Sequence, residues 1–479
     1  MSRLRILGIL VAVILPAFMT ALDGTVVNVA LPQIQTELAL DEAGLKWVAA
    51  VYPLTHSSFL LFGGHLADSK GRRLTLSLGV AVFALSSILC SVSTRAPMLI
   101  TGRGLQGVGA ALILPAALAV LSHDLPPRSR NAGFTALTVA LATALAGGPV
   151  LSGVITEHWG WNWLFVINAP IGLVSFLACA AFVPRPPSRP AMRESGVPAA
   201  PLSAIFLACI AIGGFAYCLI EGPQYGFVDS RVLLVAAASL VSLIALAVRS
   251  SLHGRGVFST LFARRAFTCG LLTQLLWGLG VSGVYFFTAL FLQNYLRLSP
   301  TSAGLMFTPV AASLLATAPF VAKLARLLGD AKVAAAGMFL VALGLLLVSL
   351  GSRRGGLVGL LPGLVAIGVG SGLAVPLTTR ALESAPDRLS GVAAGLFSAT
   401  REASGVFGIA VIGLIVTSVQ SSVADRGAGS GHAFLIGYQA GLCTAAALVA
   451  IGVPVALWGL RARVRTRQDR RGPAEAEEA

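Results

Sequence analysis

Long apolar runs recur along the whole chain, separated by short polar or Gly/Pro-rich breaks. A helix that crosses the hydrocarbon core of a bilayer needs about 20 predominantly apolar residues. Helices are expected because lipid offers no partner to an unpaired backbone group, and the sequence lacks the alternation over about 10 residues that marks a transmembrane β-strand. The pattern predicts fourteen spans, near residues 6–31, 47–66, 74–93, 97–121, 132–156, 163–183, 202–220, 232–249, 267–293, 303–327, 333–350, 356–378, 392–418 and 434–460.

The composition supports a lipid-facing surface. Of the 479 residues, 56% are hydrophobic and only 11% are charged, with a mean hydropathy of +0.85, whereas soluble proteins carry about 25% charged residues. The net charge of +15 does not indicate nucleic-acid binding, because no basic face with interleaved aromatic residues is present. Most of the 34 lysines and arginines fall in alternate loops. The positive-inside rule places these loops and both termini in the cytoplasm, so we expect a multi-pass protein of the inner (cytoplasmic) membrane.

The chain divides at a Pro- and Arg-rich segment that cannot be helical throughout. The first apolar run, although preceded by basic residues, is too long for a signal peptide and is followed by further spans, so we expect it to be retained. The predicted fold is an all-α polytopic membrane protein with an N-terminal six-helix bundle (1–184), a cytoplasmic linker (185–201), two inserted transmembrane helices (202–250), a C-terminal six-helix bundle (251–460) and a disordered cytoplasmic tail (461–479).

Ionisable residues deep within predicted spans are candidates for function, because each costs at least about 2.5–3.5 kcal/mol to insert. Asp23 lies well inside the first span, and Arg103 lies in the fourth. The Asp23 carboxyl either makes a structural hydrogen bond, to Thr25, Asn28 or a neighbouring helix, or exchanges a proton or binds a cationic substrate in a water-accessible cavity. Arg103 is expected to be an interior partner of a carboxyl or of backbone carbonyls.

The thirteenth span contains a second candidate carboxyl. Glu402 either exchanges a proton or is neutralised by its neighbour Arg401. Adjacent helical residues point about 100° apart, so we do not expect the two side chains to face the same spot. Glu221 ends the seventh span and is expected to be shallow enough to reach water.

Two glycine-containing segments indicate moving parts. In the loop GHLADSKGRR (64–73), Gly64 and Gly71 permit a tight turn, and Asp68 can accept hydrogen bonds from Arg72 or from a neighbouring helix end, with Arg73 beside it. Such a charge-paired turn would lock and release one side of the protein; the alternative is an ordinary basic loop.

The fifth span contains ALAGGPVLSG (144–153), in which Gly148, Pro149 and Gly153 allow close helix approach and a bend. Tight packing and gating are both open for this segment.

Several activities lack their sequence signals. No G-x-x-x-x-G-K-[ST] phosphate loop is present, and no Ser-His-Asp or zinc-ligand spacing stands out. The six cysteines form no CxxC pair and are expected to be small apolar side chains. Isolated histidines are weak signals. We therefore expect no enzyme activity, no cofactor and no metal.

These segments resemble the major facilitator superfamily, in particular its branch of fourteen-span drug:proton antiporters, which includes actinomycete antibiotic-resistance exporters. The first-span motif LDGTVVNVALP (22–32) and the fourth-span motif RGLQGVGAA (103–111) match in full. WGWNWLFVINAPIG (159–172) and LIEGPQYG (219–226) are also similar to the branch.

The chain departs from the family pattern at a few positions. Ser69 stands where a basic residue is usual, and Ala144 and Ser152 stand where glycines are usual. Glu402 replaces a glutamine, which adds a carboxyl that would alter substrate charge or proton stoichiometry.

The resemblance implies two six-helix halves related by a pseudo-twofold axis around a central cavity, with a binding site near the bilayer midplane. It assigns Asp23 and Arg103 to proton coupling, with Glu402 as a further candidate, and it assigns the 64–73 loop to gating. Candidates for the substrate cavity are Asn28, Gln106, Arg401 and Glu221. A faint repeat, with glycine-rich spans after a basic loop at 133–154 and 393–413, agrees with two related halves.

The expected function is export of small amphipathic molecules, driven by inward proton flow. The alternative on the same fold is proton-linked import of a metabolite, and a third class is a receptor or membrane enzyme that moves nothing. Partners are the substrate, protons and lipid; no obligatory protein partner is evident.

Overall fold

The computed structural model describes residues 2–184, 202–253, 257–353, 356–386 and 389–459, so the predicted linker (185–201) and tail (461–479) lie outside the described residues. Within the described ranges the chain is helical throughout. The helices are α1 (Arg3–Glu37), α2 (Glu42–Lys70), α3 (Arg72–Ser91), α4 (Ala96–Asp124), α5 (Pro127–Trp159), α6 (Trp163–Val166), α7 (Asn168–Phe182), α8 (Leu202–Tyr225), α9 (Ser230–His253), α10 (Val257–Phe262), α11 (Arg265–Leu290), the π-helical turn η1 (Phe291–Tyr295), α12 (Pro300–Leu305), α13 (Thr308–Leu328), α14 (Asp330–Ser352), the 3-10 turn η2 (Leu357–Gly359), α15 (Leu361–Leu373), α16 (Val375–Glu383), α17 (Ser390–Ala424) and α18 (Ser430–Gly459).

The predicted spans agree with these helices. Thirteen helical segments of the described chain are long and apolar enough to cross a membrane. Together with α2, a 29-residue helix with more polar ends, they correspond one to one with the fourteen predicted spans. Four spans contain a break that the hydrophobic pattern did not predict: α6 with α7, α11 with η1, α12 with α13, and α15 with α16.

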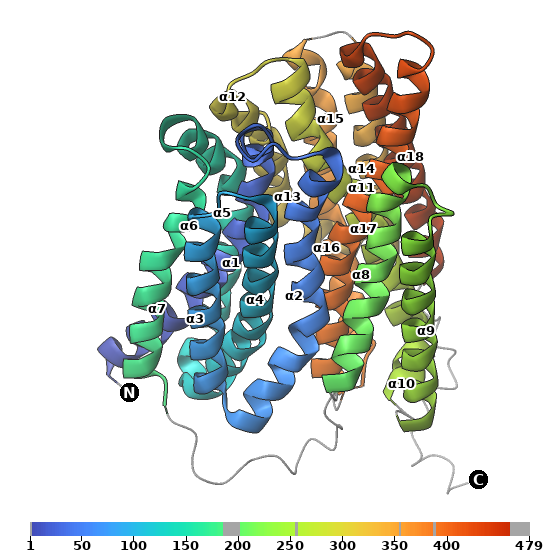
Figure 1. The fold of residues 1–479 in the computed structure, drawn as a ribbon. Helices are drawn as coiled ribbons and strands as arrows, with labels where there is room; N and C mark the ends of the chain where they lie inside the picture. Colours follow the sequence, from blue (N-terminus) through green and yellow to red (C-terminus); the bar gives the residue numbers. More distant parts are fainter. Residues whose placement is uncertain (1, 185–201, 254–256, 354–355, 387–388, 460–479) are drawn as a thin grey trace, which may run out of the picture.

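The two outer groups of helices share one packing scheme (Figure 1). In the N-terminal half, α1 packs on α5 and α7, and α3 packs on α4 and α7. In the C-terminal half, α11 takes the place of α1 and packs on α17 and α18, while α14 packs on α15 and α18. The repeated scheme is that of two structurally related six-span halves, and it makes α5 and α17 equivalent, as the faint sequence repeat suggests.

Glycine permits the same turn in both halves. Gly71 separates α2 from α3 with φ 97°, and Gly329 separates α13 from α14 with φ 86°. This backbone region is accessible mainly to glycine. Gly64, expected to help form the first turn, instead lies inside α2, because the helix continues through the whole segment GHLADSK.

The inserted pair, α8 and α9, lies alongside the bundle (Figure 1). Helix α8 packs on α9, on α2 and on α17. An apolar cluster joins α8 to α2 and α17. Its members are Ala43, Ala50, Leu54, Ala216, Ile220, Val406 and Ala410. The pair therefore covers the line along which α2 of one half meets α17 of the other.

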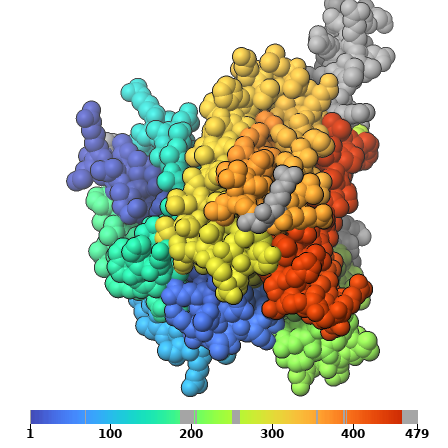
Figure 2. All heavy atoms as spheres, turned by 90° about the horizontal axis from the view of Figure 1, so that it is seen from above, coloured from blue at the N-terminus to red at the C-terminus, as the bar shows by residue number. Residues whose placement is uncertain are grey.

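Both ends of the described chain lie at one face of the bundle, where α1 begins and α18 ends (Figure 1). We call this the terminal face and the opposite one the distal face. Figure 2 looks onto the distal face, where yellow segments of the C-terminal half abut blue and teal segments of the N-terminal half.

Several contacts that join the halves lie toward the distal face. The side-chain amide of Gln293 donates to the carbonyl of Val29 (2.7 Å), and the N–H of Thr301 donates to Glu157 Oε2 (3.0 Å). Lys46 Nζ lies 3.5 Å from Thr417 Oγ1. Lys46 is the fifth residue of α2 and is buried. Toward the terminal face, α5 and α13 leave much of their surface exposed.

Candidate functional site

Asp23 and Arg103 form an ion pair inside the N-terminal half. Asp23 lies on α1 and Arg103 on α4, and both are almost completely buried, at 1% and 2% exposure. Arg103 Nη1 donates to Asp23 Oδ2 and also to Gln106 Oε1 (2.9 Å). Gln106 in turn donates from Nε2 to Asp23 Oδ1 (3.2 Å). The carboxylate therefore has a charged partner and an amide partner from the same helix.

Two further helices complete the hydrogen-bond network around Asp23. Asn168, the first residue of α7, donates to Asp23 Oδ1 (3.3 Å), and Gln106 donates to Ser87 Oγ on α3 (2.7 Å). Buried charges are tolerated when they are paired and hydrogen-bonded in this way. Sequence analysis missed Ser87 and Asn168; a polar residue in mid-span was the available signal.

These hydrogen bonds bear on the two interpretations of Asp23. Its partners lie on neighbouring helices, which is one of the structural arrangements that we expected. Thr25 is not one of these partners; its hydroxyl donates to the Leu22 carbonyl. Asn28 is half-buried and is not among the Asp23 partners found in the described part of the chain. Gln106, a candidate for the substrate cavity, belongs to the ion-pair network and is fully buried in this arrangement. In this arrangement the carboxylate is sealed from water.

Glu402 accepts hydrogen bonds from Arg401 and faces His56. Arg401 donates from Nη2 to Glu402 Oε1 (2.9 Å). The two adjacent side chains therefore meet, although we did not expect them to face the same spot. His56 Nδ1, on α2 of the other half, lies 3.6 Å from Glu402 Oε2. Arg401 itself is half-exposed, at 52% of its side chain.

Tyr52 lies between the two charged clusters. The Arg103 guanidinium carbon is 4.6 Å from the centre of the Tyr52 ring, and the His56 ring centre is 5.8 Å from it on the following turn of α2. The Tyr52 hydroxyl donates to the Thr20 carbonyl (3.0 Å). Asp23–Arg103 and His56–Glu402 are thus neighbours across one aromatic ring.

The turn between α2 and α3 lies at the terminal face and is held by an ion pair of Arg72. We expected Asp68 as the partner, but Arg72 pairs with Asp124. Arg72 binds Asp124 at the end of α4 through two hydrogen bonds of 2.7 and 2.8 Å. Arg73 donates to the carbonyl of Ala180 on α7. The side chain of Asp68 lies outside the described residues. The C-terminal half has the same contact with its charges exchanged, since Asp330 at the start of α14 binds Arg380 of α16.

The Gly-Pro segment of α5 contacts both its own half and the other one. A side chain at Gly148 would overlap Thr25 of α1, and one at Gly153 would overlap the Pro300 carbonyl of the other half. Gly304 of α12 approaches the Pro149 carbonyl equally closely. Tight packing is therefore present, and it lies at the contact between the halves.

Glu221 ties the inserted helices to the bundle. It accepts a hydrogen bond from the indole N–H of Trp47 on α2 (2.8 Å). We expected it near the substrate, but it lies at this helix contact and not beside Asp23 or Glu402.

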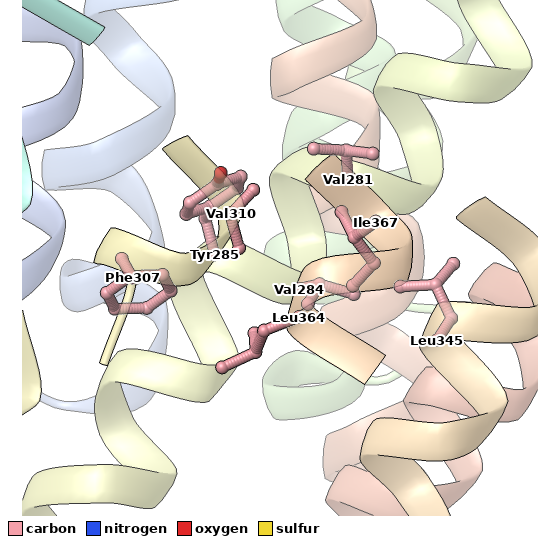
Figure 3. Close-up of a pocket in the computed structure, with 8 residues that line it drawn as sticks. All are labelled: Val281, Val284, Tyr285, Phe307, Val310, Leu345, Leu364 and Ile367. Carbon is pink, nitrogen blue, oxygen red and sulfur yellow. The ribbon is translucent and has the colours of Figure 1, made fainter. Parts of the chain in front are cut away.

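A small apolar pocket lies within the C-terminal half (Figure 3). Figure 3 shows Tyr285 and Phe307 on the side nearer the blue helices and Leu345 on the far side. The Tyr285 and Phe307 rings stack with centres 5.1 Å apart. The other lining residues are Val281, Val284, Val310, Leu364 and Ile367.

Two related six-span halves that pair charged groups at mid-span, one pair buried within a half and another between the halves, are characteristic of membrane proteins that carry solutes by alternating access. The sequence agrees, since residues 13–409 match the model of the family described as Major Facilitator Superfamily. The chain belongs to this superfamily of membrane transporters.

The chain is also similar to named resistance and export proteins. It is 32% identical over 435 residues to "Multidrug resistance protein Stp" of Mycobacterium tuberculosis, covering 89% of this chain and 78% of the relative. It is 30% identical to "Methylenomycin A resistance protein" of Bacillus subtilis (90% and 91% covered) and 33% identical to "Cephamycin export protein CmcT" of Amycolatopsis lactamdurans (87% of each).

Solved structures support the fold alone. A POT family peptide transporter described as auto inhibited aligns with a TM-score of 0.68 at 18% identity, covering 97% of this chain and 98% of that one. A bacterial homologue of the human lysosomal transporter Spinster, in an inward-facing and unoccupied conformation, aligns with a TM-score of 0.66 at 15% identity (99% and 100% covered).

Proposed function

We propose that this protein exports small amphipathic molecules from the cytoplasm in exchange for inward-moving protons. The observation that carries the proposal is the Asp23–Arg103 pair, a carboxylate held at mid-span by a cation and two amides. The named functions of the relatives, resistance and export, support the direction of transport. Inward flow across ~100 mV yields about 2.3 kcal/mol per proton, enough for roughly 40-fold accumulation of one substrate molecule.

Asp23 is connected to the contact between the halves. Thr25, two residues farther along α1, packs against Gly148 of α5, and the Ser152 hydroxyl donates to the Val26 carbonyl. One turn beyond Gly148, Gly153 contacts α12 of the other half. Protonation of Asp23 removes its attraction to Arg103, so α1 and α4 lose a contact that stabilises this packing. A change of charge at Asp23 therefore alters the position of α5 at the interface.

Substrate would bind between the halves, where polar and aromatic groups both remain available. Asn131, Thr135 and Thr138 form an exposed polar row, at positions i, i+4 and i+7, in the terminal part of α5. On α17 of the other half, Arg401 is half-exposed, and the stacked Tyr285 and Phe307 line the apolar pocket within the C-terminal half. Such a lining suits molecules with one polar and one apolar side.

The orientation is part of the proposal. Basic loops place the terminal face in the cytoplasm. The contacts Gln293–Val29 and Thr301–Glu157 then close the outer side, and the arrangement described here is the inward-facing one.

Proton movement driven by substrate tests the proposal directly. Purified wild-type protein and Asp23→Asn are reconstituted in vesicles with an internal pH dye, and the cationic dye ethidium and the neutral antibiotic chloramphenicol are added separately. We expect substrate-dependent proton flux in the wild type and at least a ten-fold loss in the variant. Flux that persists in Asp23→Asn would return Asp23 to a structural role.

The direction of transport separates export from import. Inside-out vesicles energised by an acid interior should accumulate ethidium, whereas right-side-out vesicles should exclude it. Accumulation only in right-side-out vesicles would favour the proton-linked importer.

A further inference from the structure

His56 is an ionisable group that the proposed function does not use. It lies midway along α2, is 7% exposed, and neither ring nitrogen has a hydrogen-bond partner among the described residues. A buried polar side chain without a hydrogen bond is costly and calls for an explanation. Its Nδ1 is directed at Glu402 Oε2 at 3.6 Å, which is ion-pair distance but slightly longer than a hydrogen bond.

The charged groups around His56 come from three helices. Glu402 and Arg401 face it from α17. From α4, Arg103 faces it across the Tyr52 ring, with Asp23 of α1 bound behind that arginine. The acid on α8 that contacts α2 is Glu221, which pairs with Trp47, about two and a half turns nearer the distal face than His56.

The carboxyl has two cationic neighbours, and only one of them can lose its charge near neutral pH. Arginine stays protonated under all ordinary conditions, whereas histidine changes charge between about pH 5 and 8. The number of protons held by His56 and Glu402 together therefore depends on the distance between them. That distance joins α2 of the N-terminal half to α17 of the C-terminal half.

We propose that His56 and Glu402 form a second exchangeable-proton site, separate from Asp23, which binds one proton while α2 and α17 are in contact and releases it when they move apart. The proton passes between solvent and the imidazole nitrogen, and Glu402 stabilises it as an ion pair. Proton binding and helix movement are linked. If separation of α2 and α17 weakens proton binding, a bound proton in turn makes that separation less favourable.

The two proton sites are close enough to influence each other. Tyr52 contacts Arg103 on one side and His56 on the other. A change of charge at Asp23 therefore acts on His56, and a change at His56 acts on Asp23. The interaction is strong because both groups lie in one buried region of low dielectric. The influence of the two proton sites on each other rests on the proposed proton coupling, whereas the pairing of His56 with Glu402 does not.

Nuclear magnetic resonance tests the pairing without any transported substrate. The full chain, labelled with ¹³C at its six histidines, is placed in lipid nanodiscs and titrated from about pH 5 to 9. His56→Gln identifies the His56 signal by its loss. In Glu402→Gln, loss of a counter-charge at this distance should weaken proton binding by His56 about ten-fold. The exposed His432 supplies the matched control, since His432→Gln should leave the His56 titration unchanged.

An unchanged His56 titration in Glu402→Gln would overturn the proposal. Glutamine retains the size of the side chain, and the monodisperse elution of the variant in size-exclusion chromatography confirms folding before the titration is interpreted. If the signal shifts as expected while Asp23→Asn leaves ethidium-driven proton flux intact, the second site stands and the proposed role of Asp23 fails.

The proton-to-ethidium ratio tests the role of the site in transport. In vesicles at a fixed pH gradient, His56→Gln and Glu402→Gln should each lower the number of protons exchanged per ethidium by about one, with no further loss in the double variant. A ratio equal to that of the wild type in both single variants would exclude the site from the transport cycle.

Discussion

Several charged side chains of the described residues pair across elements or across halves, as Asp23–Arg103, Arg72–Asp124 and His56–Glu402 do. The guanidinium of Arg103 serves two acceptors at once, Asp23 and Gln106, and its carbon lies over the Tyr52 ring. A planar group with several donors suits this role, whereas an ammonium group has neither the shape nor the reach. The identity of the cation, and not only its charge, is therefore fixed by its neighbours.

Arg103→Lys should reduce both stability and coupled transport. We expect a loss of about 1–3 kcal/mol in the free energy of unfolding, because Gln106 and Asp23 no longer share one donor group. Thermal unfolding followed by tryptophan fluorescence in detergent provides the measurement. Arg326→Lys, at an exposed position of α13, is the matched control. Equal unfolding midpoints for Arg103→Lys and the wild type would contradict the assigned geometry.

The Arg72–Asp124 pair at the terminal face offers a reversal experiment. Asp124→Arg places two cations together and should abolish most transport, since Asp124 is only 5% exposed in its side chain. Combining it with Arg72→Asp should restore at least part of the activity, because Asp330 and Arg380 make the same contact with the charges exchanged. Ethidium efflux from cells is the readout. No recovery in the double variant would show that the contact needs more than opposite charges.

Side-chain chemistry explains which site residues the sequence predicted. Asp23 and Arg103 could be identified because each is a charge in an apolar run that is costly to bury alone; that they bind each other was left open. His56 could not be assigned a role in the same way, since its partner Glu402 lies far along the chain and on another helix. The contact of Arg72 with Asp124 was missed for the same reason, because it depends on how α3 and α4 pack.

At the scale of elements, α5 has an unusual position. One stretch of this helix contacts α1 through Gly148 and α12 of the other half through Gly153. The reciprocal approach of Gly304 to the Pro149 carbonyl leaves no room for a side chain on either helix. The contact between the halves toward the distal face therefore depends on small residues in both halves.

Gly153→Val should hold the distal face open. The added side chain would collide with the backbone at Pro300, so the two halves cannot close there. Labelling of Thr301→Cys by a membrane-impermeant maleimide, added from outside, should become several-fold faster, and ethidium efflux should fall. Gly147→Ala is the control, because a methyl group at Gly147 meets nothing within 4 Å.

Two background measurements make the Gly153→Val result interpretable. The parent protein without Thr301→Cys reports any labelling of the six native cysteines. Slower or unchanged labelling at Thr301→Cys in the valine variant would mean that the Gly153 contact does not control closure.

Element positions were largely predictable because hydrophobic length alone specifies a span in lipid. The breaks were not, since they depend on packing between segments: η1, for example, follows α11 directly in the same apolar run. The turn between α2 and α3 also shows that helix breaks are hard to predict from the sequence. Gly71 breaks the helix, but Gly64, in the same motif, does not.

At the scale of the whole molecule, the two halves meet asymmetrically. The described contacts Gln293–Val29, Thr301–Glu157 and Lys46–Thr417 lie toward the distal face, while basic loops lie at the terminal face. If those loops are cytoplasmic, these contacts close the outer side; if the loops are external, the same contacts close the inner side. The transport cycle assigned to this structure therefore depends on its orientation.

Reporter fusions decide the orientation. Alkaline phosphatase is active only outside the cytoplasm and green fluorescent protein fluoresces when it folds inside, so the two give opposite signals across the membrane. With alternating spans and both ends of the described chain at one face, we expect fluorescence from a fusion at the C-terminus and phosphatase activity from a fusion after Gly226, between α8 and α9. The reverse pattern would turn the proposed inward-facing arrangement into an outward-facing one, and the Asp23–Arg103 pair would then belong to that state.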